Sequence, residues 1–123
     1  NTYVPLNHIC FIKIDVEGGE TEILSSISEL LHQLPVDVEI LCEVNPHWNS
    51  GRRKLADILQ RFSENGFRFF RVTNSYNPLF YIEQRAAALQ ADPQHATGPS
   101  EVSSEYLLKH KCDIIISRRL LSA

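Results

Sequence analysis

The chain has no methionine, only five glycines and three cysteines, and no long hydrophobic run. Because it starts at Asn1, a residue that normally leaves an initiator methionine in place, we expect these 123 residues to belong to a longer protein. No apolar stretch approaches the ~20 residues that span a bilayer, and no signal peptide opens the chain. We therefore expect no membrane partner.

The three cysteines are widely spaced and form no CxxC pair of the kind that binds metals. Cys10, Cys42 and Cys112 fall at or within apolar segments. We interpret them as buried free thiols of a reducing compartment, which favours a cytoplasmic protein.

A strongly basic surface is also missing. The formal net charge is −3 and the pI is about 5.9, which argues against nucleic acid as a partner. The densest cationic groups, 52–54 and Arg118-Arg119, are interpreted as solvated ends of a helix and a strand. Hydrophobic content of 43% and charged content of 22% suit one soluble globular domain.

Several catalytic motifs are absent from the sequence. There is no GxSxG nucleophile elbow, no P-loop and no pair of histidines with metal-ligand spacing. No GxGxxG turn occurs either, and Gly18-Gly19 is the nearest approach. These absences leave open a divalent cation held by carboxylates, which we keep as a minor alternative.

The first 72 residues alternate between strand and helix patterns. An apolar run at 9–16 is typical of a central strand covered on both faces, and a helical stripe follows from Glu20 to Leu34, before Pro35. A second strand is predicted at 36–44, a helix from Ser50-Gly51 to Asn65-Gly66, and a third strand at 67–72. The pattern predicts an α/β fold with parallel strands and helices on the faces of the sheet.

The pattern weakens after Thr73. Turn residues occupy 74–78, a short helix is predicted at 81–91, and 92–100 reads as a loop. Residues 103–110 are weakly helical, and 112–117 is a clear strand. We treat 1–123 as one domain in which 74–111 is a variable insertion.

Three carboxylates follow the first predicted strand. Because ligands of open α/β sheets bind beyond the carboxyl ends of the strands, Asp15, Glu17 and Glu20 are candidate site residues. Asp15 follows a buried run, so either Lys13 on the same side of the strand neutralises it or it faces a site. Glu20 has a simpler alternative role at the positive end of its helix.

The second predicted strand also ends in polar residues. Glu43, Asn45 and His47 would rise at the same edge as Asp15, and two neighbouring strands that end in such groups indicate a pocket. Trp48, the only tryptophan, would line this pocket or cover the core. His47 is either a proton acceptor or a loop residue.

The string FIKIDVEGGE at 11–20 closely resembles the KIDVEGxE signature of the FkbM family of S-adenosylmethionine-dependent methyltransferases. The resemblance implies a partial Rossmann-like methyltransferase sheet, in which 11–16 and 36–44 are the fourth and fifth strands. The segments at 67–72 and 112–117 would be the sixth and seventh strands, an antiparallel pair at one edge. Gly19 stands where the family often has alanine. The first three strands, with the Gly-rich cofactor turn, would lie before Asn1.

By this resemblance the chain is the C-terminal half of an enzyme that methylates a hydroxyl of a small acceptor and is not competent alone. Its cofactor would be S-adenosylmethionine. The candidate catalytic residues are Asp15, Glu17, Glu43 and His47, with Asp15 also touching the cofactor. Glu20, Asn45 and Trp48 are the candidate acceptor contacts.

Two further expectations follow. The alternative to an enzyme is a non-catalytic α/β domain that stands alone and serves binding or assembly. In the family's sheet the fourth strand pairs with the first, so the strand at 9–16 would present an unpaired apolar edge. Such an edge favours self-association of the 123 residues on their own.

Overall fold

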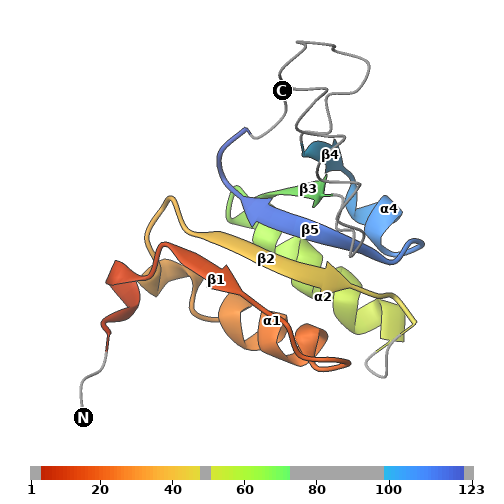
Figure 1. The fold of residues 1–123 in the computed structure, drawn as a ribbon, viewed down its shortest axis with the longest axis horizontal. Coiled ribbons are helices and arrows are strands. Elements are labelled where there is room, and N and C mark those ends of the chain that lie inside the picture. Colours follow the sequence, from red (N-terminus) through yellow and green to blue (C-terminus); the bar gives the residue numbers. More distant parts are fainter. Residues whose placement is uncertain (1–3, 48–50, 73–98, 121–123) are drawn as a thin grey trace, which may run out of the picture.

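A computed structural model describes residues 4–47, 51–72 and 99–120. In these ranges the chain forms a five-stranded sheet of order β1-β2-β5-β3-β4 (Figure 1). The strands are β1 (Phe11–Lys13), β2 (Glu39–Val44), β3 (Arg68–Val72), β4 (Ser100–Val102) and β5 (Cys112–Ser117). The helices are η1 (Leu6–His8), α1 (Glu20–Ser28), η2 (Leu31–Gln33), α2 (Gly51–Glu64) and α4 (Ser104–Leu107). None of the described helices has the length and apolar content to cross a membrane.

The strand directions combine one parallel pair with antiparallel neighbours. β1 and β2 are parallel, whereas β5 runs antiparallel to both β2 and β3. The predicted antiparallel pairing of 67–72 with 112–117 is confirmed. The position of that pair at the edge is wrong, because β4 pairs with the outer side of β3. β4 was not predicted, and the expected turn at 74–78 and helix at 81–91 lie outside the described residues.

The expectation of helices on both faces of the sheet is not met in the described chain. α1 and α2 lie side by side behind the strands (Figure 1) and share a hydrophobic core with one face of the sheet. The crossovers from β1 to β2 and from β2 to β3 advance in the same direction across the sheet. Right-handed crossovers that advance in one direction place their helices on the same face. Helices on the other face need crossovers that advance the opposite way.

The first strand is an edge strand of the described sheet, as the family resemblance predicts for these residues, but it is not covered on both faces as its apolar run predicts. Phe11 is 54% exposed and Val16 43%, and Cys10 is exposed as well, contrary to the prediction of a buried thiol. The Cys10 carbonyl accepts from Glu39 N at 3.1 Å, and Ile14 N donates to the Leu41 carbonyl at 2.9 Å. Since strand residues alternate, the N–H and C=O groups of Phe11 and Lys13 face away from β2.

Helix α1 is shorter than the stripe at 20–34 predicts. It ends at Ser28, and the chain then forms a turn and the short helix η2. Ser26 Oγ donates to the Glu22 carbonyl, and Ser28 Oγ donates to the Ser25 carbonyl at 2.6 Å. Serine side chains that bind nearby carbonyls compete with helix bonding, which explains the early end. Leu30, assigned to the buried stripe, is therefore 36% exposed.

Helix α2 agrees with its sequence pattern. Its stripe is buried at 2% exposure or less: Leu55, Ile58, Leu59 and Phe62. The predicted stop has the geometry of a Schellman motif, with Gly66 at φ +86°, Gly66 N bonded to the Ser63 carbonyl, and Phe67 N bonded to the Phe62 carbonyl. The rings of Phe62 and Phe67 pack edge to face, with 5.4 Å between their centres. This contact holds the end of α2 next to the residue that precedes β3.

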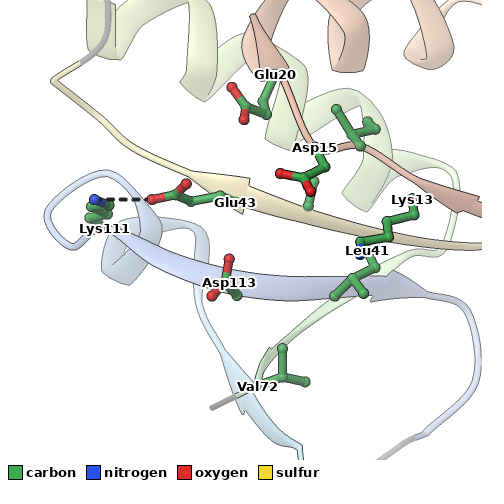
Figure 2. Close-up of a pocket in the computed structure, with 10 residues that line it drawn as sticks. Lys13, Asp15, Glu20, Leu41, Glu43, Val72, Lys111 and Asp113 are labelled. Carbon is green, nitrogen blue, oxygen red and sulfur yellow. Dashed lines mark ion pairs between the residues drawn. The ribbon is translucent and has the colours of Figure 1, made fainter. Parts of the chain in front are cut away.

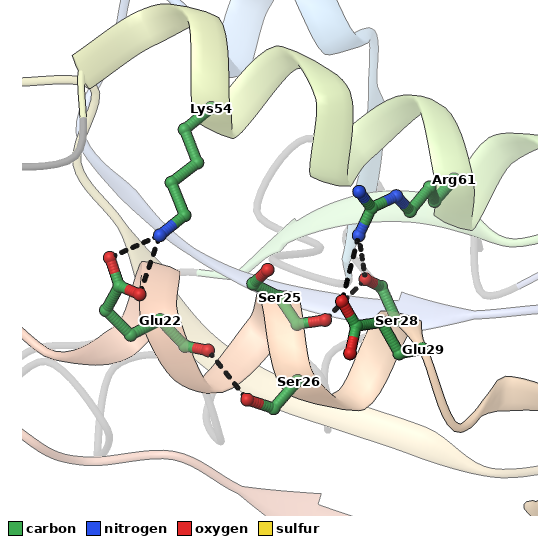
Figure 3. A network of polar contacts seen from close by, with 7 residues as sticks. All are labelled: Glu22, Ser25, Ser26, Ser28, Glu29, Lys54 and Arg61. Atoms are coloured by element: carbon green, nitrogen blue, oxygen red, sulfur yellow. Dashed lines mark hydrogen bonds and ion pairs between the residues drawn. The ribbon is translucent and has the colours of Figure 1, made fainter.

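Polar contacts hold α1 against α2 (Figure 3). Lys54 Nζ lies 2.6 Å from both carboxylate oxygens of Glu22, and Arg61 donates to Ser28 Oγ at 3.2 Å. A weaker ion pair joins Arg61 to Glu29 at 3.9 Å. The charged groups of these contacts are partly exposed, so their main effect is to fix the relative position of the two helices.

The two arginines after β5 are not simply solvated. Arg118 Nε donates to the Asn65 carbonyl at 2.8 Å and Arg118 Nη1 to the Val36 carbonyl at 3.1 Å. The Arg118 guanidinium also lies 4.2 Å from the centre of the Phe67 ring, and Arg119 pairs with Glu39. Arg118 therefore ties the end of β5 to the stop of α2 and to the loop before β2.

We predict that Arg118→Ala lowers the free energy of unfolding by about 1–3 kcal/mol, because two hydrogen bonds to carbonyls and one cation–π contact are lost. Urea denaturation followed by circular dichroism measures the change. The control is Arg68→Ala, which removes an exposed ion pair with Glu101 and should change stability by less than about 1 kcal/mol. Equal effects of the two substitutions would contradict the role of Arg118.

We propose that the free edge of β1 pairs with a second copy when the 123 residues are expressed alone. Phe11→Pro should reduce this association, because it removes an outward N–H and no bond to β2. Phe11→Val is the control, since it also removes the ring but keeps the N–H. Sedimentation velocity over a range of concentrations measures the association. If wild type is monomeric throughout, or if both variants behave alike, backbone pairing at this edge is refuted.

Candidate functional site

A pocket of about 630 Å³ lies at the carboxyl ends of β1 and β2 (Figure 2). The end of β1 and the start of α1 form one wall of the pocket, and β2 forms its floor. The start of β5 and the end of β3 form the other wall. Its lining is mostly ionisable: Lys13, Asp15, Glu20, Glu43, Lys111 and Asp113, with Ile14, Leu41, Cys42 and Val72 between them. Such volumes are typical of small-molecule sites.

Asp15 and Glu20 reach the pocket because the chain turns sharply after β1. Gly19 N donates to the Val16 carbonyl at 3.2 Å, and Gly18 has φ +85°, a left-handed conformation that favours glycine. This turn separates the exposed Asp15 from Glu20, which opens α1 and is only 3% exposed. In the described chain Asp15 makes no ion pair with Lys13. Because Asp15 is exposed, water solvates its carboxylate and the cost of a buried unpaired charge does not arise, so its role in a site stays a prediction.

Glu43 projects from β2 into the same pocket and pairs with Lys111, with 3.2 Å between Oε1 and Nζ (Figure 2). The lysine side chain is 62% exposed, so the pair contributes little to stability, about 0–1 kcal/mol. Its effect is on the site, because it engages one carboxylate oxygen of Glu43, a residue that lines the pocket.

The sequence interpretation missed Lys111 and Asp113. Asp113 lies opposite Glu43 in the pairing of β2 with β5 and opposite Val72 in the pairing of β5 with β3. Because β5 is antiparallel, its beginning lies at the edge where β1 and β2 end. The predicted antiparallel seventh strand was the signal that could have identified Asp113 as a site residue.

Other predicted site residues do not line the pocket. Glu17 is exposed in the turn before α1, and His47 is exposed after β2. Asn45 Oδ1 accepts a hydrogen bond from His47 N at 2.9 Å, so this side chain closes its own turn. Trp48 lies outside the described residues. The catalytic roles of Glu17 and His47 and the binding roles of Asn45 and Trp48 stay predictions.

The pocket also affects two cysteines. Burial raises the pKa of the Cys42 thiol well above its usual value, and the charges of Glu20 and Asp113 raise it further. Burial likewise raises the pKa of Cys112, while Arg71 lowers it and Asp113 and Glu43 raise it. Both thiols therefore stay protonated near neutral pH.

Among the described residues no group of three His, Cys, Asp or Glu side chains is placed to hold a metal ion.

A model of the methyltransferase FkbM domain matches residues 3–69, which is more than half of the chain. The chain therefore belongs to the FkbM methyltransferase family. The matched segment runs from η1 through β1, α1, β2 and α2 into β3, so it includes Asp15, Glu20 and Glu43. Comparisons with curated proteins and with solved structures give no significant match.

We predict that iodoacetamide at about pH 8 modifies Cys10 in the native protein and leaves Cys42 unmodified. Cys10 is exposed, whereas the raised pKa of Cys42 lowers its thiolate fraction at any given pH and burial blocks access. Peptide mass spectrometry measures both rates, and the same reaction in urea serves as the control, in which both cysteines should react. Rapid native labelling of Cys42 would show that the pocket wall is open.

Proposed function

We propose that this chain is the acceptor-binding C-terminal part of an S-adenosylmethionine-dependent O-methyltransferase with a Rossmann-like sheet. The observation that carries the proposal is the pocket in which Asp15, Glu20 and Glu43 meet at the carboxyl ends of the parallel strands β1 and β2. Membership of the FkbM family and the antiparallel β5 between β2 and β3 support it.

The lining residues fit ligand groups that donate hydrogen bonds. The free carboxylate of Asp15 and the second oxygen of Glu43 accept from O–H or N–H groups, which both an acceptor and the ribose of the cofactor offer. The Gly-rich turn that the family resemblance assigns to the cofactor is absent from the 123 residues. We infer that upstream residues supply most of the cofactor site and that Asp15 contributes at its border.

S-adenosylmethionine, when bound, supplies a methyl group that is open to in-line attack. The tasks of this chain are then to align the acceptor hydroxyl and to remove its proton. We assign proton removal to Asp15, because within the described chain its carboxylate has no ion pair. Glu43 shares one oxygen with Lys111 and is assigned to holding the acceptor.

Calorimetric titration of S-adenosylmethionine into this chain and into a version extended upstream tests the proposal. We expect binding to the extended chain only, because the shorter one lacks the Gly-rich turn. Binding by the 123 residues alone would show that the assignment of the cofactor site to upstream residues is wrong. No binding by either chain would favour the alternative of a non-catalytic α/β domain.

The extended chain also tests the assignment of the base. With any acceptor that is turned over, Asp15→Asn should lower kcat by about 10²–10⁴-fold, as loss of a general base does. Glu43→Gln should act more on KM than on kcat. Glu64→Gln at the far end of α2 is the control and should leave both unchanged. A kcat loss with Glu43→Gln but not with Asp15→Asn would reverse the two roles.

A further inference from the structure

Glu20 is the most unusual side chain in the pocket. The residue is 3% exposed, and its Oε2 atom has no hydrogen-bond partner among the described residues. A buried carboxylate oxygen without a partner is unfavourable, because it gives up water and gains no hydrogen bond in return. The positive end of α1 offsets part of this cost, but a helix end does not replace the missing donor.

The ionisable groups around Glu20 are mostly carboxylates. Four of the ionisable groups that line the pocket are carboxylates and two are ammonium groups. One of the two cations, Lys111, is already paired with Glu43. The other, Lys13, is exposed on β1 and makes no ion pair with the described residues. The lining of the pocket therefore carries two more carboxylates than ammonium groups.

The thiols of Cys42, which is buried in the pocket lining, and of Cys112, which is half-buried, are influenced by the same carboxylates. The charge of Glu20 is the second cause, after burial, of the raised pKa of Cys42, and Asp113 is the third. The charges of Asp113 and Glu43 likewise raise the pKa of Cys112, although burial is the main cause and Arg71 opposes them. The carboxylates of the pocket are thus close enough to disfavour a second negative charge at either thiol.

We infer that this pocket selects a small ligand that carries an alkylammonium group and that Glu20 receives this group. The inference rests on the proposed function in one respect, namely that the ligand is the methyl acceptor. A volume of about 630 Å³ suits a molecule of the size of an amino sugar or an amino alcohol. Its ammonium group would bind Glu20, which leaves a neighbouring hydroxyl for Asp15.

Three sugars of one shape and different charge test the inference without any cofactor. Glucosamine, glucose and glucuronate are titrated into the isotope-labelled protein at about pH 6, where an amine is protonated, and amide chemical shifts are followed. We expect glucosamine to bind about fivefold more tightly than glucose, the ratio that corresponds to ~1 kcal/mol. Glucuronate should bind most weakly. Equal affinities, or tighter binding of glucuronate, would overturn the inference.

Glu20→Gln keeps the shape of the side chain and should reduce the ratio of glucosamine to glucose to about one. Glu64→Gln removes the same charge far from the pocket and should leave the ratio intact. If Glu20→Gln does not fold, the sugar series with the wild-type protein still decides the outcome. In that series the preference for glucosamine over glucose should be lost in high salt. An unchanged ratio in folded Glu20→Gln would refute the role of Glu20.

The source of the ammonium group is settled by competition. In the upstream-extended protein, S-adenosylhomocysteine should leave glucosamine bound if the group belongs to the acceptor. Displacement of glucosamine would assign the ammonium site to the cofactor and overturn the acceptor assignment. Because the sugar series needs no methyl transfer, its failure would refute the charge preference without touching the proposed reaction.

Discussion

The sheet depends on the placement of β5, the last of the described strands, between β2 and β3. It pairs with both and runs against both, and its side chains Ile114 and Ile116 are fully buried in the core. Without β5, the inner edges of β2 and β3 would be unpaired, and the core that α2 shares with the sheet would lose Ile114 and Ile116. Arg118 directly follows this strand and binds carbonyls near the stop of α2 and before β2. The order of the sheet is thus fixed by contacts between distant parts of the sequence.

The reversed direction of β5 also builds the site. A parallel strand at the same position would bring its carboxyl end to the pocket, whereas an antiparallel one brings its beginning. Lys111 and Asp113 therefore stand opposite the end of β2, where Lys111 pairs with Glu43. The family match ends at residue 69, before these residues, so the part of the chain that completes the pocket is not the part that identifies the family.

Local patterns predicted what depends on neighbouring residues. The stripe of α2, its Gly66 stop and the strand at 112–117 follow from periodicity and turn chemistry, and the structure agrees. The pairing of β5 with β3 came from the family resemblance and is confirmed. What failed needed knowledge of distant neighbours. The apolar run at 9–16 has the same pattern whether it has a neighbouring strand on one side or on both. The exposure of Phe11 therefore depends on how the whole sheet is assembled.

The site shows the same limit in a sharper form. Asp15, Glu20 and Glu43 were found because each stands at a strand or helix boundary visible in the sequence, but which of them is buried was not visible. Glu20 differs from the exposed Asp15 because the turn at Gly18 places it on α1 against β2. The sequence offered an ordinary role for Glu20 at a helix terminus, a role that does not require burial. One oxygen of the buried Glu20 carboxylate has no donor among the described residues, and the excess of carboxylates over ammonium groups in the pocket lining favours a cation as the group that binds there.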